Sequence, residues 1–260
     1  MLVELSDRQA EIAQLVNEND FLTVDALSER FDVTTQTIRR DLATLCDHGL
    51  ARRRHGGIAP PMEARNISYG SRQIMARGAK LAIAREVARR IGDGASLAFS
   101  IGTTPQVVAE ALLHHEALKI FTNNLNIAML ACENPTFEVN IVGGRLRNGD
   151  RDILGPGLDK FMSSYMVDIG VYGAAGVAED GTLLDFHEDE VKARRLIRDN
   201  SRETYLVLDQ SKFGRTAHVR GGNICEATKV FCECEPPDHI VRLLNSSKSE
   251  LIVCQAELTP

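Results

Sequence analysis

Arginine residues gather in two short stretches near the N-terminus, where their chemistry suits contact with DNA. Arg39 and Arg40 form a pair, and Arg52, Arg53 and Arg54 form an uninterrupted triplet. A guanidinium group can bind phosphate or the edge of guanine through two parallel hydrogen bonds. Three adjacent arginines can neutralise neighbouring phosphates or enter the minor groove. The whole chain has a formal net charge of −6, so a DNA-binding surface must be a local basic patch.

The residues just before the arginine pair can read base edges. Gln36 can bond adenine through its amide, and Thr35 can contact a phosphate or a thymine methyl group. A helix beginning after Thr34 would present these side chains on one exposed face together with Arg39 and Arg40. Taken alone, an arginine pair on a helix is more often ordinary solvated surface, so the surrounding elements must decide between the two interpretations.

Three helices are predicted around these residues. Ser6 with Gln9 three positions later forms a capping-box start for the first helix. Thr23 and Thr34 can cap a second and a third helix, and Gly49 ends the third as a C-terminal cap. When two helices are joined by a short turn in a DNA-binding protein, the second lies in the major groove.

A short basic hairpin is predicted after the third helix. Residues 50–59 carry the arginine triplet, His55 and a Gly56-Gly57 turn. The order of helices and basic hairpin predicts a winged helix-turn-helix domain over residues 1–59. The residues predicted to contact DNA are Thr23, Thr34, Thr35, Gln36, Thr37, Arg39, Arg40, Arg52, Arg53, Arg54 and His55.

Residues 60–78 are predicted to be a polar linker. Pro60 and Pro61 close the N-terminal unit, and the stretch that follows has no helical period. Part of it, around Ser71 to Met75, can dock on a neighbouring domain.

Residues 79–254 alternate between strand and helix patterns. This alternation predicts an open, mostly parallel α/β sheet covered by helices on both faces. The predicted strands are Ser96–Ser100, Leu118–Thr122, Glu138–Val142, Asp168–Gly173 and Thr204–Asp209, and the predicted helices span 80–91, 105–113, 125–132 and 189–200.

Three polar loops follow successive strands of this predicted sheet. Gly102-Thr103-Thr104 opens a helix, where free amides and hydroxyl groups can bind an anion. The loop lacks the Gly-Lys-Ser/Thr of a nucleotide-binding loop, which favours a small phosphate ester over ATP. Asn123-Asn124 and Gly143-Gly144 end the next two strands, and such strand ends converge on one crevice. A lone Gly-Thr-Thr is more often an ordinary turn, but three polar loops together favour a ligand site.

Charged residues beyond these loops are candidates for further contacts with a phosphorylated ligand. Arginine and lysine would balance the phosphate charge, and glutamate would accept hydrogen bonds from hydroxyl groups. Ordinary surface ion pairing is the alternative for each of them. The candidates are Arg145, Arg147, Glu190, Lys192 and Lys212.

The segment from Thr34 to Leu42, Thr-Thr-Gln-Thr-Ile-Arg-Arg-Asp-Leu, resembles the signature of the DeoR family of sugar-metabolism repressors. Arg53 to Gly57 resembles the wing of that family, and the similarity continues to about Cys254. The resemblance implies a transcriptional repressor of a carbohydrate or polyol catabolic operon, released from double-stranded operator DNA by a phosphorylated metabolite. It also implies a C-terminal sensor domain similar to ribose-5-phosphate isomerase-like folds.

The resemblance also indicates the effector. The segments Ile101–Pro105, Thr122–Asn126 and Asp209–Arg215 make glycerol 3-phosphate the leading candidate. Many family members have an acidic residue two positions before the loop glycine, where this chain has Ser100, which would hold ligand hydroxyl groups more weakly. With the pocket positions that the resemblance implies, the predicted effector-binding residues are Ser100, Gly102, Thr103, Thr104, Asn123, Asn124, Gly143, Gly144, Arg147, Glu190, Lys192 and Lys212.

The alternative function is a sugar-phosphate isomerase-like enzyme with an accessory DNA-binding domain. Such an enzyme needs a general base beside a substrate carbon. The related isomerases have an Asp-rich loop at the place where this chain reads Gly173 to Val177, and no carboxylate follows here before Glu179. We therefore predict that the protein is not an enzyme.

Composition and spacing argue against several other classes. Cys225, Cys232 and Cys234 lack a second Cys/His pair at metal-site spacing, so neither a metal nor a cofactor is expected. No signal peptide and no stretch of membrane-spanning length is found, and the irregularly spaced cysteines fit reduced thiols in a cytoplasmic protein. A homodimer or homotetramer would hold two reading helices at the spacing of two operator half-sites.

Overall fold

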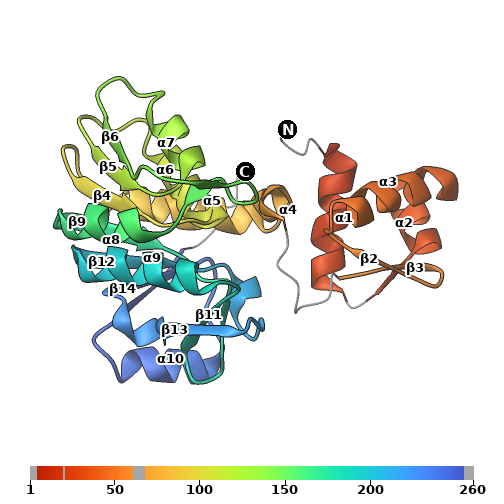
Figure 1. The fold of residues 1–260 in the computed structure, drawn as a ribbon. Helices are drawn as coiled ribbons and strands as arrows, with labels where there is room; N and C mark the ends of the chain where they lie inside the picture. The colour runs from red at the N-terminus through yellow and green to blue at the C-terminus, as the bar shows by residue number, and fades with distance from the viewer. Residues whose placement is uncertain (1–4, 20, 61–67, 255–260) are drawn as a thin grey trace. The chain divides into compact units, whose positions relative to one another are not determined.

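The computed structural model describes residues 5–19, 21–60 and 68–254. It divides into two compact units, Met1–Arg77 and Gly78–Pro260, and each unit is described separately (Figure 1).

The N-terminal unit contains three main helices and a small antiparallel sheet. The sheet order is β1-β3-β2, so the predicted hairpin is extended by a two-residue strand from the turn before the second helix. The elements are α1 (Asp7–Glu18), β1 (Leu22–Thr23), α2 (Val24–Phe31), α3 (Thr35–Asp47), β2 (Arg52–Arg54) and β3 (Gly57–Ala59).

The predicted helix caps of this unit are confirmed. Ser6 and Gln9 form a complete capping box at α1. The hydroxyl of Thr23 accepts from the amide of Ala26 at 3.1 Å, and that of Thr34 accepts from the amide of Thr37 at 3.2 Å. Each bond satisfies an amide that the first turn of a helix leaves unpaired, which fixes where α2 and α3 begin.

The stretch predicted as a linker is not wholly irregular. Residues 61–67 lie outside the described part of the chain, but Tyr69–Ile74 forms a short helix, α4, capped by Ser68. The hydroxyl of Ser71 donates to the carbonyl of His48, and Met75 packs against the core of the N-terminal unit. The expected absence of helix was therefore wrong for these residues, because contacts with the N-terminal unit stabilise a helix that the local pattern does not predict.

The C-terminal unit is built on a parallel sheet, as the alternating pattern predicts, but the sheet has two more strands, β14 and β15, than the five that were predicted. Its order is β15-β14-β12-β9-β4-β5-β6, and every neighbouring pair is parallel. The strands are β4 (Ser96–Phe99), β5 (Lys119–Thr122), β6 (Glu138–Ile141), β9 (Val167–Tyr172), β12 (Ser201–Val207), β14 (Lys229–Cys232) and β15 (Glu250–Val253).

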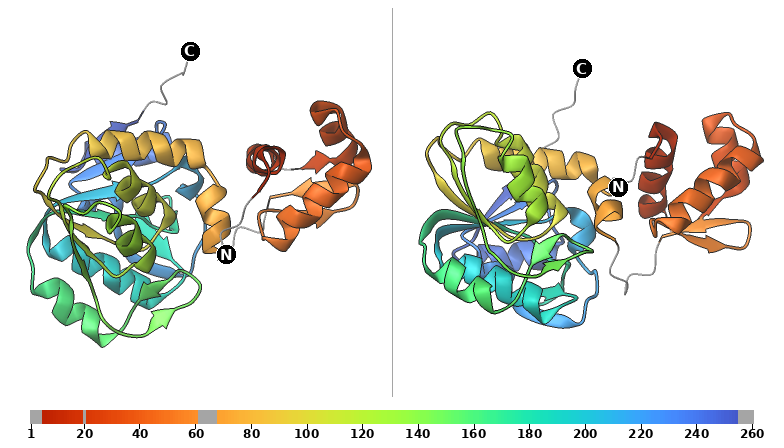
Figure 2. Two further views of the ribbon diagram at one scale, coloured as in Figure 1. Left: turned by 90° about the horizontal axis from the view of Figure 1, so that it is seen from above. Right: turned by 45° about the horizontal axis from the view of Figure 1, so that its top comes forward.

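Helices cover both faces of this sheet (Figure 2). One face packs on α5 (Arg77–Ala88), α6 (Thr103–Ala111) and α7 (Leu125–Ala131). The other packs on α8 (Pro156–Ser163), α9 (Glu188–Asp199) and α10 (Asp238–Asn245). The two apolar layers bury the strands on both sides, which is the usual arrangement of a parallel sheet.

Several short elements of the C-terminal unit were not predicted. A hairpin of β7 (Leu146–Arg147) and β8 (Asp152–Ile153) follows β6. A separate small sheet contains β10 (Gly176–Val177), β11 (Thr182–Asp185) and β13 (Val219–Asn223). Two 3₁₀ turns, Gln210–Lys212 and Ile224–Glu226, follow β12 and β13. Among the described residues, no helix combines the length and the apolar composition that crossing a bilayer requires.

Candidate DNA interface and effector site

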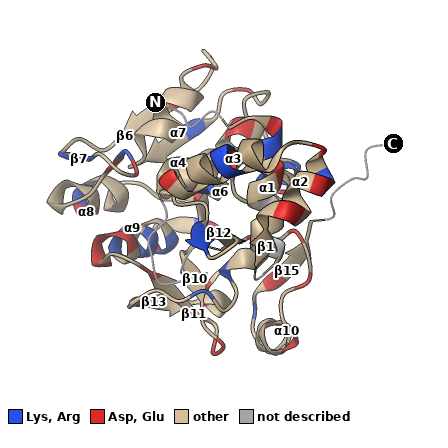
Figure 3. Cartoon of the chain, turned by 90° about the vertical axis from the view of Figure 1, so that its right-hand side faces the viewer, with Lys and Arg blue, Asp and Glu red and all other residues tan. Residues whose placement is uncertain are grey.

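The helix α3 presents the predicted base-reading residues on its exposed side. Gln36, Arg39 and Arg40 are exposed, whereas Ile38 and Leu42 point into the core. The basic residues of α3, which are both arginines, appear in blue in Figure 3. Thr35 and Thr37 are half-buried and Thr34 is exposed. A helix with its apolar stripe packed and its arginines free to solvent has the geometry that major-groove binding needs.

Asp41 fixes α3 against α1, although sequence reasoning gave it no role. It is only 5% exposed, and it accepts from Nε of Arg8 at 2.7 Å and from Nε2 of Gln9 at 2.9 Å. The available signal was its position, because Asp41 lies among the apolar residues of the helix stripe, where a carboxylate needs a partner.

The hairpin places the arginine triplet in solvent. Arg52, Arg53, Arg54 and His55 are all exposed. The two-residue turn is His55-Gly56 and not Gly56-Gly57, because Arg54 pairs with Gly57. A Cβ atom at Gly57 would lie 2.0 Å from the carbonyl oxygen of Leu22, so glycine permits the close approach of β1.

Side-chain contacts orient part of this wing. Nε of Arg52 donates to the carbonyl of Pro60 at 3.0 Å. The guanidinium carbon of Arg54 lies 6.0 Å from the ring centroid of Phe21, within the range of a cation–π contact. The remaining N–H groups of these arginines face solvent and can bind phosphate.

The three predicted effector loops lie at adjacent strand ends. β4, β5 and β6 are neighbours in the sheet and run parallel, so their carboxyl ends lie along one edge. We call this edge, with the loops that follow its strands, the carboxyl edge. The prediction that these loops share one edge is therefore confirmed, and the edge has the position at which open α/β sheets bind ligands.

Gly102 begins α6 in a conformation suited to glycine. Its φ is +135°, and no side chain caps the helix. A Cβ atom there would approach Cδ of Pro105 to 3.1 Å. Thr103 and Thr104 form the buried first turn, and Ser100 is buried just before the loop. The N-terminus of α6 thus offers amides and hydroxyl groups to an anion.

Asn123 and Asn124 are both 0% exposed at the end of β5. Oδ1 of Asn124 caps α7 by accepting from the amide of Asn126 at 2.8 Å, and Nδ2 of Asn123 donates to the carbonyl of Ile153 at 3.1 Å. Within the described part of the chain, Oδ1 of Asn123 and Nδ2 of Asn124 have no hydrogen-bond partner. A buried acceptor and a buried donor without partners are costly unless a ligand or water pairs with them.

Arg147 is the centre of a cluster of three carboxylates. Its Nε and Nη2 donate to the two oxygens of Asp152 at 2.9 and 3.0 Å. Nη2 also lies 3.0 Å from Asp150 and 2.7 Å from Glu190, which reaches it from the first turn of α9. We call Arg147, Asp150, Asp152 and Glu190 the arginine cluster. It joins the β7–β8 hairpin to α9.

Burial and ion pairing oppose each other in this cluster. Burial raises the pKa of Asp152 and of Glu190, and the charge of Arg147 offsets this only in part. Burial disfavours the charged form of Arg147, but hydrogen bonds to Asp152 and Glu190 more than compensate and raise its pKa. The guanidinium of Arg147 therefore stays charged, and its single positive charge only partly balances the negative charges of the carboxylates around it.

A second set of charges follows β12. Nζ of Lys212 lies 3.8 Å from Oδ2 of Asp209, which is almost fully buried. Burial opposes the charge of Asp209, but Lys212 and the buried Lys80 of α5 together lower its pKa below the ordinary value. Sequence reasoning missed Lys80, whose signal was its position on the apolar face of α5 beside Ile83 and Ala84.

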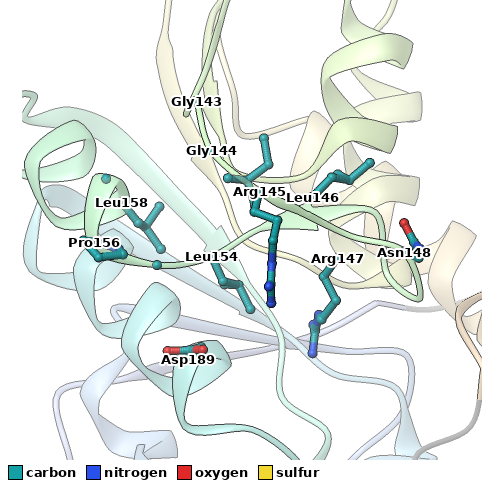
Figure 4. A pocket seen from close by; sticks show the side chains of 13 residues that line it. Gly143, Gly144, Arg145, Leu146, Arg147, Asn148, Leu154, Pro156, Leu158 and Asp189 are labelled. Carbon is teal, nitrogen blue, oxygen red and sulfur yellow. The ribbon is translucent and has the colours of Figure 1, made fainter.

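A pocket of about 760 Å³ opens beside the β7–β8 hairpin (Figure 4). Gly143, Gly144 and Arg147 of the predicted set line it, together with Arg145 and with Asp189 of α9. Figure 4 shows the side chains of Arg145 and Arg147 extending in the same direction, toward the helix that carries Asp189. Lys192 does not line it, and its ammonium group lies 2.6 Å from Asp159 on the surface.

Together these features define a protein with a winged helix-turn-helix unit and a second, α/β unit whose parallel sheet carries polar loops along its carboxyl edge. The DeoR-like helix-turn-helix domain matches residues 8–63, and the DeoR C terminal sensor domain matches residues 76–233. The chain belongs to the DeoR family.

Similar proteins support this assignment over nearly the whole chain. The glycerol-3-phosphate regulon repressor of Haemophilus influenzae is 42% identical over 251 residues, which cover 96% of this chain and 98% of that protein. The repressor of the same name from Escherichia coli is 39% identical over 249 residues, covering 96% and 99%. Among solved structures, ribose 5-phosphate isomerase A of Methanocaldococcus jannaschii is 18% identical with a TM-score of 0.39, covering 52% of this chain and 54% of that one.

Proposed function

We propose that this protein is a transcriptional repressor of a carbohydrate or polyol catabolic operon, and that glycerol 3-phosphate releases it from its operator. The observation that carries the proposal is the combination of an exposed arginine face on α3 with polar loops that meet at the carboxyl edge. The relatives that match end to end are named glycerol-3-phosphate regulon repressors, which supports the repressor function and makes glycerol 3-phosphate the first effector to test.

The DNA-reading role is assigned to the exposed face of α3 and to the wing. Gln36, Arg39 and Arg40 would contact base edges, and the wing residues 52–55 would contact phosphates. Thr23, Thr34 and Thr37 would contribute mainly by holding the helix starts in place. The hydroxyls of Thr23 and Thr34 already cap helices, and the hydroxyl of Thr37 lies 3.0 Å from that of Thr34.

The effector role is assigned to the carboxyl edge. The phosphate would bind at the N-terminus of α6, and the hydroxyl groups would reach the unpartnered atoms of Asn123 and Asn124. Lys212 would balance the phosphate charge, while Arg147 and Glu190 would lie beside the end of the ligand that is opposite the phosphate. Ser100, Gly143 and Gly144 would shape the walls, and Lys192 would act at most from the surface.

A binding function is favoured over isomerase catalysis. The loop after β9 is held by the arginine–carboxylate pair of Arg194 and Asp185, because the amide of Ala175 donates to Oδ1 of Asp185 at 3.0 Å. A carboxylate already paired with a guanidinium is a poor general base. The names of the relatives, which are repressors, also favour a binding function over catalysis.

We further propose a homodimer or homotetramer, with residues 1–59 as the DNA-binding domain, 60–78 as the connection and 79–254 as the sensor domain. Two copies of α3 would occupy successive major-groove half-sites. Effector binding would change the spacing between the N-terminal units and so lower operator affinity.

Thr103→Val tests the effector site directly, because valine keeps the shape of threonine and removes its hydroxyl. Loss of one hydrogen bond to a charged group costs about 1.5–3 kcal/mol, so glycerol 3-phosphate should bind about 10- to 150-fold more weakly. Operator binding without effector should be unchanged in fluorescence anisotropy. Unaltered release of the variant by glycerol 3-phosphate would contradict the assigned site.

A further inference from the structure

The carboxyl edge is charged unequally at its two sides. At the end of β12, Lys80 and Lys212 flank Asp209, and Glu233 adds a second carboxylate beside it, so the charges on that side balance. The arginine cluster lies on the other side, where one guanidinium faces three carboxylates.

The negative excess of the arginine cluster is buried. Asp150, Asp152 and Glu190 are each no more than 9% exposed, so water screens them little. The other cations close by are less effective, because Arg145 and Arg151 are exposed to solvent and Lys192 is paired with Asp159. A ligand in the crevice therefore meets a side that favours hydrogen-bond donors and repels anions.

The N-terminus of α6 and the arginine cluster lie beside the ends of neighbouring strands. β4 and β5 are neighbours, and neighbouring strands lie about 4.8 Å apart. The loop of Gly102 follows β4, while Asn124, which follows β5, forms a bridge with Asp152 of the arginine cluster. The unpartnered atoms of Asn123 and Asn124 lie at the end of this same strand. A three-carbon phosphate ester held at the N-terminus of α6 would therefore extend toward the side of the edge that carries the cluster.

We propose that this site selects esters with a single phosphate and an uncharged, hydroxyl-bearing opposite end, and that the arginine cluster rejects ligands with a second anionic group. The inference rests on the proposed function, since it concerns the selectivity of the same effector site. A hydroxyl group donates to a carboxylate of the cluster. A carboxylate or second phosphate has no proton to donate and places like charges together in a poorly screened site.

Two ligands with the same carbon skeleton test the proposal on the full-length protein. Glycerol 3-phosphate ends in a CH₂OH group, and 3-phosphoglycerate carries a carboxylate at that position. Isothermal titration should show 3-phosphoglycerate binding about 100-fold more weakly, because a like-charge contact in a poorly screened site should cost at least twice the free energy of a tenfold change in affinity.

Variants of the arginine cluster test whether the cluster causes the preference for glycerol 3-phosphate over 3-phosphoglycerate. Glu190→Gln removes one negative charge and should narrow the ratio of the two affinities. Glu188→Gln is the matched control, because Glu188 is exposed on the same helix turn, and it should leave the ratio unchanged. Asp150→Asn serves as a second cluster variant should Glu190→Gln not fold.

Each contrary result has a separate meaning. Equal affinity of the wild-type protein for the two ligands, or an unchanged ratio in the cluster variants, would overturn the inference and leave the proposed function standing. Binding of neither ligand would contradict the proposed function and the inference together.

Discussion

At the scale of single residues, the exposed arginines of α3 carry the proposed DNA reading. Arg39→Ala removes a side chain that faces solvent and packs on nothing in the core, so folding should be unaffected. A bidentate base contact contributes about 1–3 kcal/mol, which predicts a loss of operator affinity of about 5- to 150-fold. Fluorescence anisotropy with an operator duplex measures this loss of affinity. Arg30→Ala, an exposed arginine on α2, is the control and should bind normally.

The titration of Glu190 is a second property of a single residue. Burial raises its pKa above the ordinary 4.5, so the folded state binds its proton more readily than the unfolded state. The contribution of Glu190 to stability therefore falls as pH rises from about 4.5 through the raised pKa, and it is regained on acidification.

Comparison of Glu190→Gln with the wild-type protein tests this pH dependence. The variant should show a shallower decrease in the free energy of unfolding as the pH rises above about 4.5. Denaturant unfolding at several pH values gives the slopes, with Glu188→Gln again as control. Parallel slopes for Glu190→Gln and the wild-type protein would show that Glu190 does not titrate in this range.

At the scale of elements, the position of α3 depends on a buried carboxylate as well as on apolar packing. Asp41→Ala leaves Arg8 and Gln9 without their partner. Arg8 is partly exposed, so we expect a loss of only about 1–3 kcal/mol from the N-terminal unit. Urea unfolding of the full chain measures this loss. Asp47→Ala, at an exposed position of the same helix, should change stability far less.

The elements also show what a sequence can predict. The capped helices α1 to α3 and the order of strands β4, β5, β6, β9 and β12 follow from local caps and apolar periodicity. Strands of two residues, such as β1 and β7, contain too few positions to form a pattern. The helix α4 has a local cap in Ser68, but it is only six residues long and also depends on a bond between Ser71 and His48, which are 23 residues apart.

The candidate site could be predicted from sequence where a polar loop directly follows a strand. Gly102, Thr103 and Asn123 were found in this way, since parallel strands must end at one edge. The bonds of Arg147 to Asp150 and Asp152 form within the β7–β8 hairpin, whose two-residue strands leave no pattern in the sequence. The bond of Arg147 to Glu190 depends on a tertiary contact between β7 and α9. Sequence alone left Arg147 and Glu190 as separate candidates, and the structure joins them.

At the scale of the whole molecule, the account requires thermodynamic coupling between the two units. An effector that lowers operator affinity must itself bind more weakly to the operator-bound protein, by the same factor. Couplings of this kind are about 1–3 kcal/mol, or about 5- to 150-fold in affinity. Glycerol, which lacks the phosphate, should have no such effect, because nothing would hold it at the N-terminus of α6.

The most direct measurement is the operator affinity of the full-length protein with and without saturating glycerol 3-phosphate. A duplex selected by the wild-type protein from a random pool can serve as the operator, with glycerol as the matched ligand control. The operator dissociation constant should rise about 5- to 150-fold with glycerol 3-phosphate and stay constant with glycerol. An operator dissociation constant that glycerol 3-phosphate leaves unchanged would contradict the proposed release from DNA.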